Sequence, residues 1–329
     1  MTNSLTFEAV RELSPGVKWQ ALFERHWPRY RSWFLHDGEH ERPSYAESRR
    51  ALAEHMPELL GVYDELCKLA GGGDLEARML AMWRPPSYLS GCSQGVWTRG
   101  KPMLVRNYDY SPERFEATIV FTGWGGRWVI GMSDCLWGLL DGVNDAGLAV
   151  SLAFGGRRVI GNGFGIPLVV RYLLQVCESV AEARAVLQRL PYNLAHTLTL
   201  ADRSGDIATA YLAPDRGVVL RPIGVATNHQ AEVDWPEHAR ATRTLERESR
   251  IVALLEHDAV DSESFAAAFL HSPLYSTEYE RGLGTLYTAV YRPNTGDAEY
   301  RWPRLVWRHS FRDFDEGTRT VRLLETTAA

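Results

Sequence analysis

The spacing of apolar residues along the chain changes near residue 90. Before that point, segments 44–55 (SYAESRRALAEH) and 56–70 (MPELLGVYDELCKLA) place apolar residues three and four positions apart, as amphipathic helices do. Gly71, Gly72 and Gly73 then interrupt the pattern, as expected at a helix end. This spacing predicts that residues 1–70 are helical.

After residue 90 the chain consists mainly of short strand-like arms around turn sequences such as TRGK, GWGG, NDAG, DRSG and NTGD. The paired arms are 92–97 with 101–108, 116–122 with 127–132, 135–143 with 148–154, 196–201 with 206–213, and 285–293 with 298–302. Helical patterns occupy 166–178, 180–190, 237–257 and 262–271. Hairpins in runs, with helices grouped between them, favour antiparallel sheets covered by helices over a βαβ alternation. We therefore expect one domain with the N-terminal helical segment built into it.

Composition and charge limit the kinds of molecule that the protein is expected to bind. Apolar residues make up 45% of the chain and charged residues 23%, which is typical of a globular protein. A net charge of −5 with a pI near 6.1 gives no general attraction to nucleic acid. The sequence contains neither a signal peptide pattern nor an apolar run long enough to span a bilayer. We expect a cytoplasmic protein that binds neither nucleic acid nor membranes.

The four cysteines lie far apart and form no CxxC pair, so the sequence predicts free thiols and no disulfide framework, metal site or cofactor. Cys67, Cys135 and Cys177 lie in helical or apolar surroundings that suit buried structural residues. Cys92 differs because it follows a glycine and begins a hairpin whose second arm carries Arg, Asn and Asp. It is therefore the candidate for chemistry.

The register of this hairpin decides which groups face the thiol. If Thr98 pairs with Lys101, Cys92 faces Asn107, and Asp109 lies two residues further on the same face. A slip of one residue would replace Asn107 by Arg106, and the sequence does not fix the register. Both registers leave the thiol beside a cation and polar acceptors.

Two interpretations of Cys92 remain open at this point. A free cysteine is commonly a small buried residue, in which case Arg106 and Asp109 would form a surface ion pair. Gly91 favours the other interpretation, because a residue without Cβ leaves its carbonyl open to attack by the following thiol.

The segment GCSQGVWTRGKPMLVRNYDY resembles the nucleophile hairpin of N-terminal nucleophile (Ntn) hydrolases of the penicillin acyltransferase family, which contains isopenicillin N acyltransferase. That family is more distantly related to bile salt hydrolases, penicillin V acylase and acid ceramidase. The resemblance implies an α+β fold, a four-layer αββα sandwich of two antiparallel sheets flanked by helices. It also implies autocatalytic cleavage between Gly91 and Cys92, which divides the chain into an N-terminal segment 1–91 and a core 92–329. The motif RNxD corresponds to Arg106, Asn107 and Asp109.

Further motifs follow in the order of the family. DGVNDAGLAVS resembles the NE-x-GL segment and offers Asn144, with Asp145 where Glu is common. GVATNHQ resembles the TNH segment and offers Asn228. TLERESRIVALL resembles an S-x-x-R helix start and offers Arg247, with Arg243 as an alternative. The resemblance covers roughly residues 50–315.

The chemistry of these residue types suggests their roles. The α-amino group released at Cys92 lies within reach of its own thiol and can serve as the base. Arg106 would favour the thiolate, and Asp109 can accept from the α-ammonium and orient it. Asn228, with its neighbouring backbone N–H, is the expected oxyanion hole, with Asn144 as the second donor. Arg247 would hold Asp109 or the head group of the substrate.

These inferences predict a self-processing cysteine amidohydrolase or acyltransferase. It would cleave a linear amide or N-acyl C–N bond other than a peptide bond, through a thioester. Its partners would be a small-molecule substrate, an amine or acyl-coenzyme A co-substrate in the case of a transferase, and the two fragments of its own chain. One alternative is an uncleaved thiol enzyme that pairs Cys92 with His229 or His196. Another is a catalytically silent member of the fold that binds a ligand.

Overall fold

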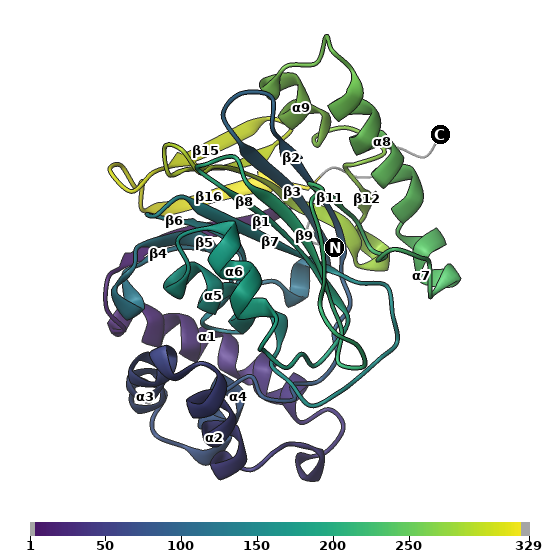
Figure 1. Ribbon diagram of the computed structural model, residues 1–329. Coiled ribbons are helices and arrows are strands. Elements are labelled where there is room, and N and C mark those ends of the chain that lie inside the picture. Colours follow the sequence, from purple (N-terminus) through teal and green to yellow (C-terminus); the bar gives the residue numbers. More distant parts are fainter. Residues whose placement is uncertain (1–3, 324–329) are drawn as a thin grey trace.

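Two β-sheets packed face to face occupy the centre of the fold, and helices cover their outer faces (Figure 1). The computed structural model describes residues 4–323. Buried side chains of strands β2 and β3 in one sheet meet those of β7 and β8 in the other, so the main core lies between the sheets. This arrangement matches the expected layers.

The larger sheet has nine strands. In spatial order they are β10 (Val219–Arg221), β9 (Ile207–Leu212), β8 (His196–Asp202), β7 (Leu148–Phe154), β6 (Gly138–Asn144), β5 (Val129–Asp134), β4 (Thr118–Thr122), β1 (Ser4–Glu12) and β16 (Gly317–Arg322). Neighbouring strands are antiparallel except for β1 and β4, which are parallel.

The smaller sheet carries the hairpin that begins at Gly91. Its order is β11 (Val225–Ala226), β2 (Gly91–Trp97), β3 (Met103–Tyr110), β13 (Leu283–Arg292), β14 (Asp297–Trp302) and β15 (Leu305–His309), and the short β12 (Thr277–Glu278) pairs with β13. All of these pairs are antiparallel. A β-bulge between Thr285 and Tyr287 interrupts β13 opposite the end of β3. Bulges of this kind re-aim side chains beside functional sites.

The helices form the two outer layers (Figure 1). Helices α5 (Ile166–Val176) and α6 (Val180–Leu187) cover the nine-stranded sheet, and α8 (Thr244–Glu256) covers the seven-stranded sheet together with α7 (Pro236–Ala241) and α9 (Ser262–Ala268). Helices α1 (Val17–Phe34), α2 (Tyr45–His55), α3 (Leu60–Leu69) and α4 (Asp74–Leu80) lie on the same side as α5 and α6. Helix α5 is buried nearly all round, which fits its almost continuous apolar sequence IPLVVRYLLQV.

The N-terminal region departs from the sequence prediction at one place. Residues 1–70 were expected to be helical, but Ser4–Glu12 forms β1 at the centre of a strand trio with β4 and β16. Within SLTFEAVRE, Leu5, Phe7 and Ala9 alternate with more exposed residues, which is the two-residue period of a strand. The helical prediction was wrong here because this period covers only a few residues.

The hairpin has the alternative register. Cys92 pairs with Tyr108 and Trp97 pairs with Met103, so the arrangement with Cys92 opposite Asn107 is wrong by one residue. The connection runs through residues 98–102, one residue longer than the turn assumed from the sequence. Since the side-chain period is two, Arg106 shares the face of Cys92, whereas Asn107 lies on the opposite face.

Candidate active site

Cys92 is the second residue of β2, and its side chain is fully buried between the two sheets. Its Sγ atom lies 3.4 Å from Nη2 of Arg106 and 3.7 Å from Oγ of Ser90. Burial raises the pKa of the Cys92 thiol, and the Arg106 charge opposes that rise only in part. In the continuous chain the thiol is therefore less acidic than a free cysteine, contrary to the expected net effect of Arg106.

Asn228 follows β11 and binds the backbone on both sides of Gly91. The backbone N–H of Cys92 donates to its Oδ1 at 2.9 Å, and its Nδ2 donates to the Ser90 carbonyl at 3.1 Å. Nδ2 also lies 3.3 Å from the Phe154 carbonyl oxygen. The backbone N–H of Asn228 donates to Oγ1 of Thr244 at 2.7 Å, so it is already committed. The side-chain amide is the group of Asn228 that reaches Cys92.

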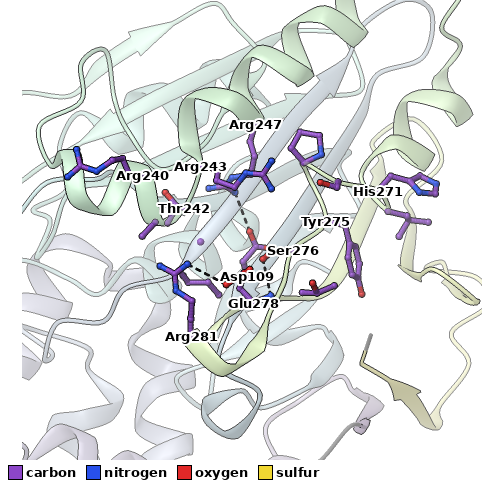
Figure 2. Close-up of a pocket in the computed structure, with 17 residues that line it drawn as sticks. Asp109, Arg240, Thr242, Arg243, Arg247, His271, Tyr275, Ser276, Glu278 and Arg281 are labelled. Atoms are coloured by element: carbon purple, nitrogen blue, oxygen red, sulfur yellow. Dashed lines mark hydrogen bonds and ion pairs between the residues drawn. The ribbon is translucent and has the colours of Figure 1, made fainter. Parts of the chain in front are cut away.

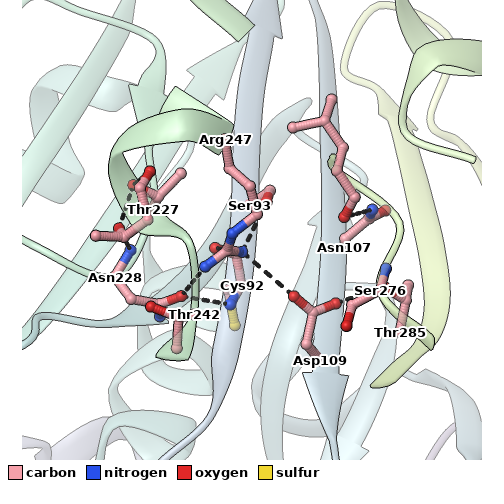
Figure 3. A network of polar contacts seen from close by, with 12 residues as sticks. Cys92, Ser93, Asn107, Asp109, Thr227, Asn228, Thr242, Arg247, Ser276 and Thr285 are labelled. Atoms are coloured by element: carbon pink, nitrogen blue, oxygen red, sulfur yellow. Dashed lines mark hydrogen bonds and ion pairs between the residues drawn. The ribbon is translucent and has the colours of Figure 1, made fainter. Parts of the chain in front are cut away.

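Arg247 on α8 connects the remaining polar groups around Cys92 (Figure 3). Its Nη1 donates to the Cys92 carbonyl at 2.6 Å, to Oγ of Ser93 at 2.9 Å and to Oδ2 of Asp109 at 3.2 Å. Its Nη2 donates to Oδ1 of Asn228 at 2.6 Å. Arg247 thus holds the Cys92 carbonyl, the Asp109 carboxylate and the Asn228 amide together.

Arg243, the alternative to Arg247, lies outside this network. Its side chain is half exposed and pairs with Glu246 one turn along α8. It is the N-cap residue of α8 and has a left-handed backbone conformation.

Asp109 is the penultimate residue of β3 and lies buried between Arg247 and the bulge of β13. Oγ1 of Thr285, which pairs with Asp109 beside the bulge, donates to Oδ1 of Asp109 at 2.6 Å. Burial raises the pKa of the Asp109 carboxyl, while Arg247 and the Thr285 hydroxyl oppose the rise. Asp109 pairs with Gly91, so its carboxylate lies next to the bond between Gly91 and Cys92.

The close approach of Asp109 explains why position 91 is a glycine. A Cβ built on it would lie 2.9 Å from Cβ of Asp109 and 3.2 Å from Oδ2 of that residue. The first contact is shorter than those that real Cβ atoms make and the second is tighter than most, and the nearer atom is a Cβ whose position is fixed by its backbone. The glycine therefore lets Asp109 approach the chain at this bond.

A Gly91→Ala substitution is expected to slow any reaction at this bond at least tenfold. The methyl group would push Asp109 away and cost about 1–3 kcal/mol of stability by overpacking. Gly61→Ala is the matched control, since nothing lies within 4 Å of the Cβ that it adds to α3. Fragment yield over time on denaturing gels and thermal melting would measure both effects. Equal yields for the two variants would contradict this role of Gly91.

The structure does not bring Asn144 to Cys92. It ends β6 in the other sheet, where its Nδ2 donates to the carbonyls of Leu174 and Cys177 and its Oδ1 accepts from Leu148 N–H. These bonds close the NDAG turn against α5. Asn144 is therefore not the second oxyanion donor, and its assignment to the site was wrong because asparagine is common at turns for conformational reasons.

Asn107 is also committed elsewhere. Its Nδ2 donates to the carbonyls of Phe269 and Leu274, and its Oδ1 accepts from Thr288, so it ties β3 to the segment after α9.

Neither histidine considered as a partner for Cys92 takes that position. Within residues 4–323, no histidine forms a hydrogen bond with the Cys92 sulfur. The His229 ring faces Oγ1 of Thr244 at 3.0 Å and Glu248 at 3.3 Å. Burial lowers the pKa of His196 to about 3, so its imidazole stays neutral. The Cys-His arrangement therefore lacks a geometric basis.

Several residues of the site carry no motif in the sequence. Ser90 and Ser93 lie on either side of Gly91 and Cys92, Thr285 holds Asp109, and Thr244 holds the backbone of Asn228. Small hydroxyl residues are too frequent to be singled out from sequence. The one available signal was Thr244, which occupies the serine position of the S-x-x-R pattern.

A cavity of about 450 Å³ opens on the Gly91 and Asp109 side of the hairpin (Figure 2). Helices α7 and α8 line it on one side and the segment 270–283 on the other. Its charged lining residues are Asp109, Glu278, Arg240, Arg243, Arg247 and Arg281. Four arginines and two acidic residues thus line the cavity, and each arginine is paired with a carboxylate: Arg240 with Glu237, Arg243 with Glu246, Arg247 with Asp109 and Arg281 with Glu278.

The described residues hold neither a metal cluster nor a membrane span. Across residues 4–323, His, Cys, Asp and Glu side chains nowhere gather in threes to ligate a metal ion. Over the same range, every helix is too short or too polar to cross a bilayer. The four cysteines are free thiols, as the sequence predicted.

Comparisons with known proteins identify the fold and the family of the chain. No curated protein sequence matches the chain. Among solved structures, penicillin V acylase from Agrobacterium tumefaciens matches with a TM-score of 0.50 at 15% identity, covering 71% of this chain and 92% of that one. This likeness supports the Ntn-hydrolase fold.

Two further structures are similar at lower scores. The N-acylethanolamine-hydrolyzing acid amidase ortholog of Caenorhabditis elegans has a TM-score of 0.46 at 15% identity and covers 70% of this chain and 99% of that one. A mutant conjugated bile acid hydrolase from Clostridium perfringens has a TM-score of 0.41 at 13% identity, covering 71% and 98%.

The sequence model of one family matches residues 97–305, which is most of the chain. This range includes Arg106, Asp109, Asn228 and Arg247, and it begins just after Cys92. The penicillin acyltransferase resemblance is thereby confirmed: the chain belongs to the acyl-coenzyme A:6-aminopenicillanic acid acyltransferase family.

Proposed function

We propose that this protein is a self-processing cysteine enzyme that cleaves or transfers the acyl group of a small-molecule amide. The observation that carries this proposal is the surroundings of the bond between Gly91 and Cys92. Asn228 binds the chain on both sides of it, Arg106 faces the sulfur, and Arg247 holds the Cys92 carbonyl and Asp109. An ordinary buried cysteine has no need of two buried arginines.

The first reaction would act on the chain itself. The Cys92 sulfur attacks the Gly91 carbonyl carbon, the C–N bond breaks, and the thiol proton ends on the nitrogen that becomes the new α-amine. Water then hydrolyses the Gly91 thioester and releases the carboxyl group of Gly91 and the free thiol. The fragments are residues 1–91 and 92–329.

The second reaction would use the groups exposed by the first. Loss of the Ser90 carbonyl from Nδ2 of Asn228 frees that donor for the oxyanion of a substrate amide. The new α-amine of Cys92 stays near Oδ1 of Asn228 and the Asp109 carboxylate, which can orient it as the base. The α-amine takes the thiol proton and passes it to the leaving amine, and the acyl thioester then goes to water or to another amine.

Denaturing electrophoresis with intact-mass measurement tests self-processing directly. Purified wild-type protein is expected to give two chains whose masses place the cut between Gly91 and Cys92. Incubation with a panel of N-acyl amides, with and without an added amine, then separates hydrolysis from acyl transfer by the products. A single uncut chain that still turns over amides would overturn the proposal.

The arginines of the cavity point to a class of substrate. The cavity reaches Gly91 and Asp109 directly, and Arg240 and Arg281 stand at its rim (Figure 2). Their present partners, Glu237 and Glu278, are exposed glutamates three residues away, and such pairs are weak enough for a carboxylate on the leaving group or acyl group of a substrate to replace them. We therefore propose acidic N-acyl compounds as substrates of a cytoplasmic enzyme.

The double variant Arg240→Gln/Arg281→Gln is expected to raise KM for acidic amides two- to tenfold, with kcat little changed. Each exposed charge contributes at most about 1 kcal/mol to binding, and lost uniform binding appears in KM. Lys68→Gln on α3 is the control, because it removes an exposed cation outside the cavity. Steady-state kinetics on matched acidic and neutral amides would show the effect, and an equal rise for both would contradict it.

A further inference from the structure

Asp141 is a fully buried carboxylate on β6, in the sheet opposite Cys92. It forms an ion pair with Nη1 of Arg106 and accepts hydrogen bonds from the hydroxyls of Tyr287, at 2.5 Å, and Tyr291. The Tyr291 hydroxyl also lies 3.0 Å from that of Tyr300. These contacts join the two sheets through a polar cluster inside an apolar core.

Such a cluster needs an explanation other than stability. Removing two charges from water costs several kcal/mol, and well-packed apolar residues often stabilise a core as well as a buried ion pair does. Arg106 and Asp141 are each 0% exposed, so neither recovers any hydration at the surface. The presence of this ion pair between the sheets is better explained by its effect on a neighbouring side chain.

That neighbour is the sulfur of Cys92. Nη1 of Arg106 is occupied by Asp141 and, at 2.8 Å, by the Tyr287 hydroxyl, and this leaves Nη2 facing Sγ at 3.4 Å. The Nε atom of Arg106 has no hydrogen-bond partner among the described residues. The direction of the guanidinium therefore depends on its bonds to Asp141 and Tyr287.

The negative charge of Asp141 also cancels part of the effect that the positive charge of Arg106 has on the Cys92 sulfur. The titratable groups that act electrostatically on Cys92 are Arg106, Asp109, Arg247, Tyr88 and Tyr108. Of these, Arg106 is the cation in contact with the sulfur, and its charge is shared with Asp141. A neutral residue at position 141 would leave more of that charge to act on the sulfur.

We propose that Asp141 is a positioning residue for the nucleophile, which aims the Arg106 guanidinium at Cys92 and limits how strongly it stabilises the thiolate. The inference rests on the proposed function, because it assumes that Cys92 is the nucleophile. Through this arrangement the thiol remains largely protonated until the base takes its proton.

An Asp141→Asn variant tests the electrostatic part of the inference. Asparagine keeps the size and one acceptor oxygen but removes the charge, so the pKa of the Cys92 thiol is expected to fall because more of the Arg106 charge then acts on the sulfur. The measurement is the rate of Cys92 labelling by iodoacetamide across pH, followed by peptide mass spectrometry. We expect labelling near neutral pH to be several-fold faster than in wild type.

A Tyr291→Phe variant keeps every charge and is expected to change the rate of Cys92 labelling in the opposite direction. Without this hydrogen bond the Asp141 carboxylate acts more strongly on Arg106, so labelling is expected to slow about twofold. If Asp141→Asn does not fold, as thermal melting would reveal, Tyr291→Phe decides alone. A merely structural role would not produce opposite shifts in the two variants.

Asp202→Asn is the matched control, because Asp202 is also a buried aspartate of the nine-stranded sheet but caps α6 and the β8–β9 turn. Its labelling rate should equal that of wild type. The inference is overturned if Asp141→Asn labels no faster than wild type, or if Tyr291→Phe labels no slower. Failure of the proposed function would appear separately, as a wild-type chain that is not cut.

Discussion

Replacement of Cys92 by alanine is expected to leave the chain whole and to reduce amide turnover to the uncatalysed level. The substitution removes the sulfur that we propose to attack both the Gly91 carbonyl and the substrate. The side chain is fully buried and small, so the loss of one atom should cost only about 1 kcal/mol of stability. Denaturing electrophoresis, intact mass and an amide hydrolysis assay on the purified variant would measure these outcomes.

The other buried cysteines provide matched controls for this variant. Cys135→Ala and Cys177→Ala remove thiols that are 3% and 1% exposed and have no contact with the site residues described above. Both variants should be cut as wild type is and should retain activity. If Cys92→Ala yielded the two fragments, or if either control remained whole while folded, Cys92 would not be the nucleophile.

Asn228→Ala is expected to lower kcat about a hundred- to a thousandfold, the usual effect of losing one oxyanion donor. Asn228 is also expected to matter for cleavage, because its side chain holds the Cys92 N–H and the Ser90 carbonyl in the continuous chain. Fragment formation should therefore slow as well. Single-turnover kinetics on protein that has been fully cut would separate the two effects.

Asn144→Ala is the informative control, because sequence motifs singled out both asparagines. Its side chain binds the Leu174 and Cys177 carbonyls, so the variant should lose about 1–3 kcal/mol of stability and keep its kcat. Chemical denaturation and steady-state kinetics would test this pair of outcomes. A comparable loss of kcat in both asparagine variants would contradict the division drawn from the structure.

The sequence was sufficient for the layers of the fold because alternating apolar residues and turn sequences recur through the hairpins. It was insufficient for the register of β2 and β3, since a connection longer by one residue leaves the alternation intact while exchanging Asn107 for Arg106. β1 was missed because only Leu5, Phe7 and Ala9 carry its period.

The sequence likewise predicted some residues of the candidate site and missed others. Motif order pointed to Arg106, Asp109, Asn228 and Arg247, which the structure brings around Cys92. The same reasoning included Asn144, because an asparagine that closes a turn and one that faces a nucleophile look alike in sequence. Asp141 could not be recognised at all, since its partners lie on strands far away in the chain.

The position of β1 has a consequence for the product of the proposed self-cleavage. After cleavage this strand would belong to the fragment 1–91, yet it lies between β4 and β16 of the rest of the chain and is hydrogen-bonded to both. Separating the two polypeptides would require breaking the hydrogen bonds of β1 to both of its neighbours within the nine-stranded sheet. The mature enzyme would therefore behave as a permanent heterodimer that dilution does not dissociate, and residues 92–329 produced alone would lack a strand they need in order to fold.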